Sequence, residues 1–189
     1  MTLLSRAATS DADDVLTLYR SLIGTPGCTW HADYPTAEIV ASDLAKGALY
    51  IIRDADDELI GAVTVGDATE LVAEIKRFDK TATVTLARPG EIARFAVRTD
   101  QQGRGLGREI LNQAISIARA SDGTASTGNR PTDDPDAPTA SGQPKYDGLC
   151  LLVSPENAPA LHLYHQAGFQ NRGGLFNWGF QWAYLELRF

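Results

Sequence analysis

A run of alternating glycines near the middle of the chain has the composition of a phosphate-binding turn. It reads Gln102-Gly103-Arg104-Gly105-Leu106-Gly107-Arg108 and lies between a segment with strand periodicity and one with helical periodicity. Glycine lets a backbone pass close to a ligand, and the free N–H groups at the start of a helix attract negative charge. The segment therefore predicts a turn whose backbone binds a pyrophosphate, with a purely structural turn as the alternative.

Two other kinds of phosphate site fit this turn poorly. A dinucleotide-binding turn needs G-x-G-x-x-G or A, and this chain has Arg108 where the last small residue should stand. A Walker A loop needs Gly-Lys-Ser/Thr, which does not occur in the sequence. Both a nicotinamide site and a P-loop nucleotide site are therefore disfavoured.

A second block of residues follows the next strand-like segment and reads Asn157-Ala158-Pro159-Ala160-Leu161-His162-Leu163-Tyr164-His165-Gln166-Ala167-Gly168-Phe169. Together with the glycine turn it resembles the GNAT superfamily of acetyl-CoA-dependent N-acetyltransferases. The family's Gln/Arg-x-x-Gly-x-Gly/Ala, between a strand and a helix, is matched by Gln102, Gly105 and Gly107. Its Asn-x-x-Ala-x-x-Leu-Tyr-x-x-x-Gly-Phe is matched by the second block. The resemblance implies an acyltransferase that transfers acetyl from acetyl-CoA to a primary amine. Because no nucleophile is positioned by a base, we expect direct transfer in a ternary complex, and no metal is expected.

The resemblance also implies which residues contact the cofactor. Those expected to do so, mostly through their backbone, are Phe95, Ala96 and Val97 before the turn and Gln102, Gly103, Arg104, Gly105, Leu106, Gly107 and Arg108 within it. Asn157 matches a family position that often hydrogen-bonds the pantetheine arm, and Ala160 is small enough to admit that arm. Asn157 can also serve as a helix N-cap, and the two roles are compatible.

Transfer to an amine requires two proton movements, for which Glu91 and Tyr164 are the candidates. An alkyl ammonium with a pKa of ~10.4 lies about three pH units above neutrality, so deprotonating it costs roughly 4 kcal/mol. Glu91 resembles, in its distance from Gln102, the general base of some family members, and a water relay is the alternative. Tyr164 matches the tyrosine whose hydroxyl faces the CoA sulfur and could protonate the thiolate. Ordinary packing of Tyr164 on its helix is the competing interpretation.

The acyl acceptor is expected to be a small-molecule or peptide amine. An aromatic loop over residues 28–35 stands where the family's first two helices usually wall the acceptor site, and Trp30 and Tyr34 are the candidate pocket residues. Aromatic side chains in such a loop can instead fasten it to the core. A non-catalytic acyl-CoA-binding or sensing module, or a transferase for a longer acyl group, would share the cofactor motifs.

The elements that must position these residues follow from the periodicity of the sequence. The expected helices run from the cap at 10–13 to Gly24, from 36 to 46, from 106 to 118 and from 157 to 166. The expected strands are 49–52, 59–65, 91–97 and 149–153, followed by two terminal β segments that end at Phe189. The stretch 66–89 fits both a helix and a strand and is left unassigned. We expect one GNAT-like domain of α/β (α+β) class over residues 3–189, with a single mixed, mostly antiparallel sheet flanked by helices.

One stretch of this domain is unlike the rest. Residues 121–146 hold four of the nine prolines and no Ile, Leu, Val, Phe, Met or Trp. Such a composition cannot bury a core, and a loop of this length in a compact domain is usually disordered or functional. We therefore expect a flexible surface insertion between a helix and the next strand.

Charge and cysteine usage narrow the possible partners. Seventeen Lys plus Arg against 24 Asp plus Glu give a net charge of −7, so no attraction to nucleic acid or anionic membranes is expected. No apolar run approaches the ~20 residues that span a bilayer, and the N-terminus has no signal-peptide core, which predicts a cytoplasmic protein.

Cys28 and Cys150 are expected to be free thiols, and His162 and His165 lack a third ligand for a metal. The terminal strand 182–189 could pair with a second subunit in a homodimer.

Overall fold

The computed structural model describes residues 3–120 and 145–189. The elements are β1 Ser5–Arg6, α1 Ala12–Leu22, α2 Ala37–Ala45, β2 Leu49–Arg53, β3 Leu59–Asp67, α3 Thr69–Phe78, β4 Pro89–Val97, α4 Leu106–Arg119, β5 Gly148–Val153, α5 Ala158–Gln166, β6 Gln170–Asn177 and β7 Phe180–Arg188. The strands form one seven-stranded sheet in the order β1-β2-β3-β4-β5-β7-β6. Neighbouring strands are antiparallel except for β4 and β5, which are parallel. The expected mixed, mostly antiparallel sheet is thus confirmed.

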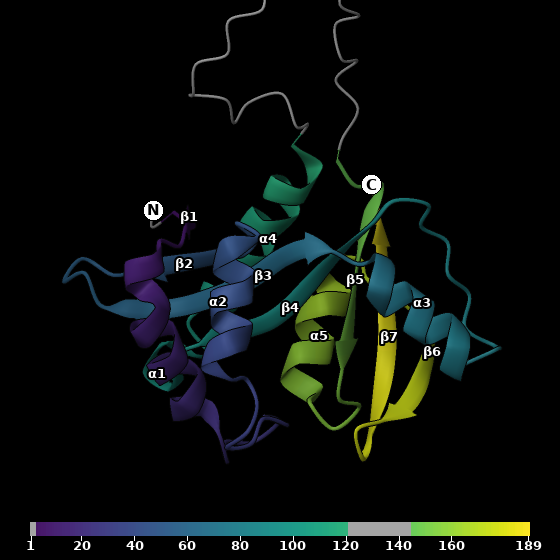
Figure 1. The fold of residues 1–189 in the computed structure, drawn as a ribbon, viewed down its shortest axis with the longest axis horizontal. Helices are drawn as coiled ribbons and strands as arrows, with labels where there is room; N and C mark the ends of the chain where they lie inside the picture. The colour runs from purple at the N-terminus through teal and green to yellow at the C-terminus, as the bar shows by residue number, and fades with distance from the viewer. Residues whose placement is uncertain (1–2, 121–144) are drawn as a thin grey trace, which may run out of the picture.

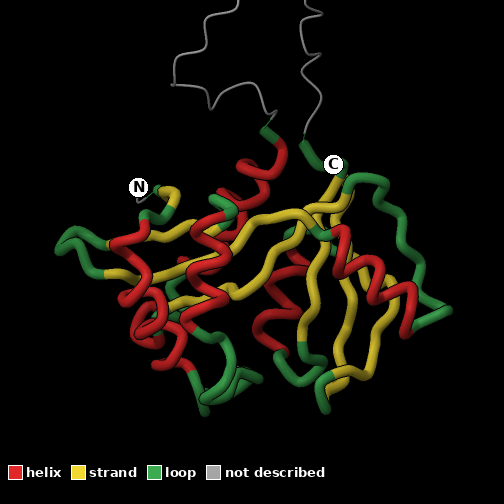
Figure 2. Tube along the Cα trace, viewed as in Figure 1, coloured by secondary structure: helices red, strands yellow, loops and turns green. Residues whose placement is uncertain are grey.

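Helices cover both faces of the sheet (Figure 1, Figure 2). On one face α1 and α2 pack over β2 and β3, and α3 packs over β5 and β7. On the other face α4 and α5 pack against the sheet. Because successive side chains of a strand point to opposite faces, Cys150 of β5 faces α3, whereas Leu149 and Leu151 face α4 and α5. Among the described residues no helix is long and apolar enough to span a membrane.

The stretch 66–89, which periodicity leaves open, contains a helix followed by an irregular segment. Helix α3 ends at Phe78, and the alternating residues 81–86 form no strand. Instead, the Thr85 N–H and hydroxyl donate hydrogen bonds to the buried Glu186 carboxylate, with the hydroxyl at 2.6 Å, and the Thr83 N–H donates to the Arg172 carbonyl at 2.8 Å. Because the Glu186 side chain and the Arg172 carbonyl accept these hydrogen bonds, the segment stays attached to the sheet without pairing as a strand.

Two expectations at the C-terminal half need correction. Residues 121–144 of the expected insertion lie outside the described residues, but Tyr146 at its end is buried in the core. The ring of Tyr146 covers Gly90, where an added Cβ would come within 2.8 Å of it. The expected pairing of strand 182–189 with a second subunit is also wrong, because β7 is paired on both sides, with β5 and with β6.

Candidate active site

Strands β4 and β5 pair over only three residues and then separate. The parallel ladder joins Pro89–Glu91 to Gly148–Cys150. Beyond it β4 continues beside β3 to Val97, while β5 continues beside β7 to Val153. Figure 1 shows the two strands diverging from this point, with α5 seen in the opening. Where the two strands separate, the edge of β4 that faces β5 is not paired with β5 and can hydrogen-bond an extended ligand.

A β-bulge in β4 lies inside this opening. The register with β3 moves from Ala62 opposite Ala96 to Thr64 opposite Ala93, so β4 holds one extra residue. Arg94 at the bulge has a φ of 46°, a conformation that few residues other than glycine adopt and that is common near functional sites. As a result, Phe95 packs toward α5 while Ala96 packs toward α1.

The glycine turn at the end of β4 is open and has no side-chain cap. Gly103 and Gly105 have φ values of 73° and 89°, and a Cβ added to either would meet nothing within 4 Å. Gly105 is the N-cap of α4 and no side chain accepts a hydrogen bond from the first turn. Exposed N–H groups with the positive end of the helix dipole suit a phosphate ligand. The turn therefore fits the pyrophosphate of acetyl-CoA.

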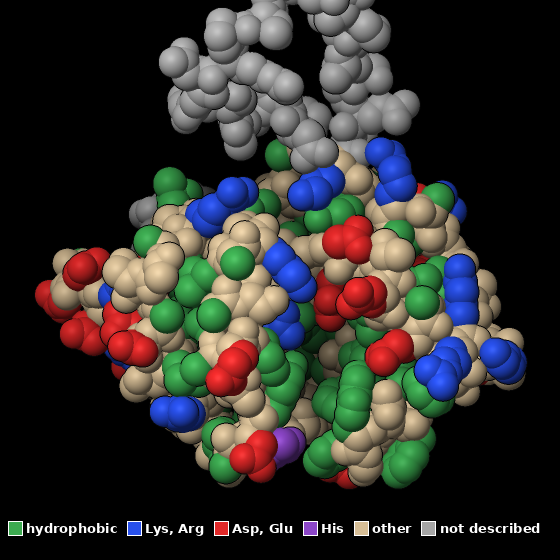
Figure 3. All heavy atoms as spheres, viewed as in Figure 1, with side chains coloured by type: hydrophobic (Ala, Val, Ile, Leu, Met, Phe, Trp, Pro, Cys, Tyr) green, Lys and Arg blue, Asp and Glu red, His purple; other side chains and the backbone are tan. Residues whose placement is uncertain are grey.

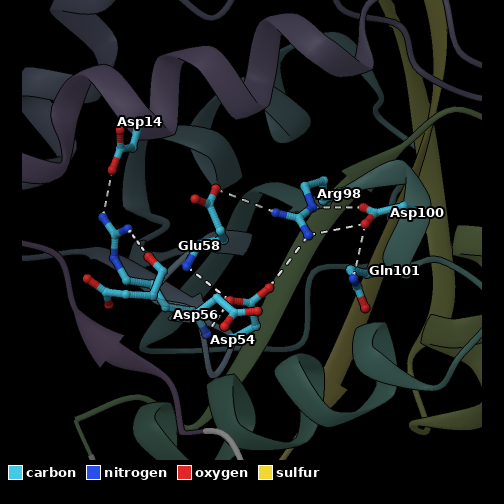
Figure 4. A network of polar contacts seen from close by, with 9 residues as sticks. Asp14, Asp54, Asp56, Glu58, Arg98, Asp100 and Gln101 are labelled. Atoms are coloured by element: carbon cyan, nitrogen blue, oxygen red, sulfur yellow. Dashed lines mark hydrogen bonds and ion pairs between the residues drawn. The ribbon is translucent and has the colours of Figure 1, made fainter.

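Side chains around the turn hold it against the sheet. Gln102, expected to contact the cofactor, donates its Nε2 to the Val97 carbonyl at 3.0 Å. Arg98, just after β4, pairs with Asp100 at 2.8 Å and with Asp54 of the acidic β2–β3 turn at 3.6 Å (Figure 4). Exposed ion pairs of this kind contribute at most about 1 kcal/mol each. Their effect is to fix where β4 ends and the turn begins.

Gly105→Ala is expected to raise the Kd for acetyl-CoA at least tenfold, because the methyl group enters the open space before α4 and disturbs the N–H groups. A matched control is Gly179→Ala in the β6–β7 turn, since Gly179 has a φ of 79° and equally open surroundings. Both variants should lose about 1–2 kcal/mol of stability from the positive φ. Calorimetric titration checks the prediction, which is wrong if the two variants bind acetyl-CoA equally well.

Tyr164 of α5 is buried beside the strand edge of β4. Its ring centroid is 6.4 Å from that of Phe95 on β4 and 5.6 Å from that of Phe169. Burial raises the pKa of Tyr164, so its hydroxyl stays protonated at neutral pH. Within the described residues no protein group hydrogen-bonds this hydroxyl, which leaves its proton available to a ligand. Ala160, one helical turn earlier, is partly buried on the same packed surface.

Asn157 caps α5 and also reaches the loop between α1 and α2. Its Oδ1 accepts a hydrogen bond from the Ala160 N–H at 3.1 Å, which confirms the N-cap role. Its Nδ2 donates to the carbonyl of Gly27 at 2.9 Å. The expected contact with pantetheine stays a prediction. The link to Gly27 joins residues 130 positions apart and gives no signal in the sequence.

Glu91 lies where β4 and β5 separate and points to the face opposite Tyr164. It occupies the last paired position, beside Cys150, and alternates with Ile92, which packs on the α5 side. Burial raises the pKa of Glu91, the Arg94 guanidinium lowers it, and Asp43 raises it further. A carboxylate with a raised pKa is a better proton acceptor than an exposed one. The opening thus has a potential base on one side and a protonated phenol on the other.

A buried ion pair beside Glu91 was not predicted from the sequence. The Arg94 Nε lies 2.6 Å from Asp43 Oδ2 and its Nη2 lies 2.9 Å from Oδ1, and the side chains are 15% and 7% exposed. The Thr64 hydroxyl donates to the same carboxylate at 2.8 Å. The pair fixes α2 over the bulge of β4. The available signal was Asp43 three positions after Val40, a charge on the apolar side of the predicted helix.

The two aromatic pocket candidates have different surroundings. Trp30 packs edge to face on Tyr19, with ring centroids 4.9 Å apart, which is the arrangement expected of a residue that fastens the loop. Tyr34 is partly buried and lies close enough to Arg94 to influence its electrostatics. Figure 3 shows this face hollowed between the α1–α2 side and the α3 side. Tyr34 therefore comes nearer to the β4 bulge, and Trp30 belongs to the core of α1.

Known structures share this arrangement at low sequence identity. A GNAT-family acetyltransferase from Streptococcus agalactiae is 16% identical with a TM-score of 0.74, over 100% of this chain and 95% of that one. NAA60 of Arabidopsis thaliana, in complex with acetyl-CoA, is 17% identical with a TM-score of 0.67 over 100% of both chains. A spermidine N-acetyltransferase chimera that includes Vibrio cholerae sequence is 16% identical with a TM-score of 0.62, over 99% of this chain and 95% of that one.

Sequence comparison identifies the family directly. No curated protein matches the chain. The model of the acetyltransferase (GNAT) family matches residues 15–132, more than half of the chain, from α1 through the glycine turn and α4. This match and the shared fold agree with the open turn and the separated strands described above. The protein therefore belongs to the GNAT family of acetyltransferases, which are acyltransferases.

Proposed function

We propose that this enzyme transfers the acetyl group of acetyl-CoA directly to a primary amine in a ternary complex, and that the amine belongs to a small molecule or a peptide. The observation that carries the proposal is the opening between β4 and β5, which has the glycine turn at one end and Glu91 at the other. Tyr164 lies along its α5 side. The arrangement of these residues around the β4–β5 separation supports the proposal.

The cofactor supplies an activated acetyl thioester. Backbone N–H groups from Gly103 to Arg108 bind the pyrophosphate, and the free edge of β4 at Phe95, Ala96 and Val97 orients the pantetheine arm. The Val97 carbonyl already accepts from Gln102, so its second lone pair is the one left for a ligand.

The chain's own groups then move the protons. Glu91, directly or through a water molecule, accepts the proton of the acceptor ammonium, and the free amine attacks the acetyl carbonyl carbon. A C–N bond forms, the C–S bond breaks, and Tyr164 donates its proton to the sulfur. The second proton, which the nitrogen loses as it becomes an amide, returns to the phenolate through water, and Glu91 releases the first proton to solvent after the products leave.

Direct transfer is supported by the state of the thiol beside Glu91, that of Cys150. Cys150 is fully buried, and burial raises the pKa of its thiol to about 12. A thiol in this state does not supply the thiolate that an acyl-enzyme would require. Initial-rate kinetics should therefore give intersecting lines, as sequential mechanisms do, and parallel lines would indicate an acyl-enzyme.

An amine panel tests the proposed function. Purified protein with acetyl-CoA is offered spermidine, lysine, tyramine and a tetrapeptide with a free N-terminus, and release of CoA thiol is recorded. Turnover with at least one amine, and none without protein, is the expected result. Acetyl-CoA binding without any turnover would contradict the proposal and favour a non-catalytic acyl-CoA-binding module. The same assay with longer acyl-CoA species identifies the preferred acyl group.

A further inference from the structure

The loop between α1 and α2, residues 23–36, is held to the start of α5 by one side chain. The Asn157 Nδ2 donates to the Gly27 carbonyl at 2.9 Å while the Oδ1 of the same amide caps α5. Figure 1 shows this loop and the start of α5 at the same edge of the molecule. Both polar atoms of the Asn157 side chain are thus engaged, one with α5 and one with the α1–α2 loop.

The contact is a close packing as well as a hydrogen bond. A Cβ built on Gly27 would lie 2.9 Å from both Cγ and Oδ1 of Asn157, closer than such atoms approach in proteins. The φ of 80° at Gly27 turns its carbonyl toward the amide. Only glycine therefore lets the loop backbone lie against Asn157.

The same loop leads to the acceptor side of the site. Trp30 fastens it to Tyr19 of α1, and Tyr34 lies by Arg94, whose partner Asp43 holds α2. The loop has one anchor in the core of α1, one at the β4 bulge, and a third at the cofactor side of the opening. Without the third anchor, the hydrogen bond from Asn157 to Gly27, the part of the loop that precedes Tyr34 is less firmly held.

We propose that Asn157 is a positioning residue that sets the α1–α2 loop for acceptor binding by holding the carbonyl of Gly27. This inference rests on the proposed function, since it assigns the loop to the amine. The link adjusts how well the amine binds and leaves the chemical step unchanged. Breaking the link at Gly27 should raise KM for the amine while kcat and acetyl-CoA affinity remain.

Two glycines of this loop give a matched pair of variants. Gly24 and Gly27 have nearly equal φ values, 79° and 80°, but a Cβ on Gly24 meets nothing within 4 Å. Gly24→Ala therefore introduces the same backbone strain without touching Asn157. Comparing the two separates the contact from the cost of a positive φ.

The experiment uses the full chain and the amine of the panel with the highest kcat/KM. Gly27→Ala should raise KM for that amine about three- to tenfold above Gly24→Ala, the range expected for one hydrogen bond, with little change in kcat or in the Kd for acetyl-CoA. Asn157→Ser, which keeps a good N-cap but cannot reach Gly27, should raise KM for the amine similarly when acetyl-CoA is saturating. Because Asn157 is also an expected pantetheine contact, only its amine KM enters this comparison. The double variant Gly27→Ala/Asn157→Ser should be no worse than either single variant, because both break one link.

A second measurement carries the test if Gly27→Ala fails to fold. Hydrogen exchange of the amides in residues 25–35 should be faster in Asn157→Ser than in the wild type, whereas α5 keeps its protection. Equal amine KM in Gly24→Ala and Gly27→Ala, multiplying effects in the double variant, or unchanged loop exchange in Asn157→Ser would each overturn the inference. A wild-type protein that acetylates no amine refutes the proposed function instead, so the two failures are distinguishable.

Discussion

Glu91→Gln is expected to lower kcat/KM for the amine by a factor of about 100 to 1,000, within the range typical of a lost general base. Glutamine keeps the size of the side chain and the hydrogen bonds it can accept at one oxygen, but it cannot take up a proton at neutral pH. The packing of the β4–β5 junction should therefore survive while the proton acceptor is lost. Initial rates at subsaturating amine measure the effect.

The pH profile distinguishes this role from a structural one. Burial raises the pKa of Glu91 above its usual value, and the carboxyl must be ionised to act as a base. Activity of the wild type should therefore fall as pH drops below that raised pKa. In Glu91→Gln this limb should vanish, leaving only the titration of the amine. Glu70→Gln, the same change at an exposed position on α3, serves as the control. Undiminished activity with an unchanged acid limb would exclude Glu91 as the base.

Tyr164→Phe is expected to lower the rate of the chemical step by a factor of about 10 to 100. The effect should be smaller than that of Glu91→Gln, because transfer from a phenol with a pKa of ~10 to a thiolate with a conjugate acid near 8.5 is uphill even in water. Burial, which raises the pKa of Tyr164 further, makes the phenol a weaker acid but keeps it protonated.

Single-turnover measurements and acetyl-CoA titration separate acid catalysis from packing. Phenylalanine keeps the ring contacts with Phe95 and Phe169, and the lost hydroxyl has no hydrogen-bond partner among the described residues. Folding stability and the Kd for acetyl-CoA should therefore stay close to those of the wild type. A single-turnover rate equal to that of the wild type would show that the hydroxyl donates no proton in the transition state.

Local signals were enough to predict most of the elements. The N-cap of α2 is Thr36, as its position in the sequence indicates, and Asn157 caps α5 in the same way. The glycine turn was recognisable because backbone approach and positive φ restrict the residue type to glycine at Gly103 and Gly105. Helix caps and glycine turns depend on a few neighbouring residues, so the local sequence pattern is enough to predict them.

Features that depend on contacts between distant segments were not predictable. Tyr146 ends a polar stretch yet is buried, because Gly90 leaves room for its ring on the sheet. The ion pair of Arg94 with Asp43 joins residues 51 positions apart, and the bulge at Arg94 arises from the register between two strands. The periodicity of a single strand does not show how that strand is aligned with its neighbour, so the bulge could not be predicted from it. The ion pair and the bulge were therefore visible only in the folded chain.

The glycine turn and the β4–β5 opening are proposed to form the acetyl-CoA site. Thermal unfolding of the purified protein, recorded in parallel with acetyl-CoA, free CoA, NAD and ATP, tests this proposal most directly. A ligand at ~100 times its Kd adds about 2.7 kcal/mol to the stability of the folded state. We predict that acetyl-CoA and CoA raise the unfolding midpoint, whereas NAD and ATP do not. Gly105→Ala should reduce this rise, and Gly179→Ala should leave it unchanged. No rise with acetyl-CoA, or a larger one with NAD, would contradict the account.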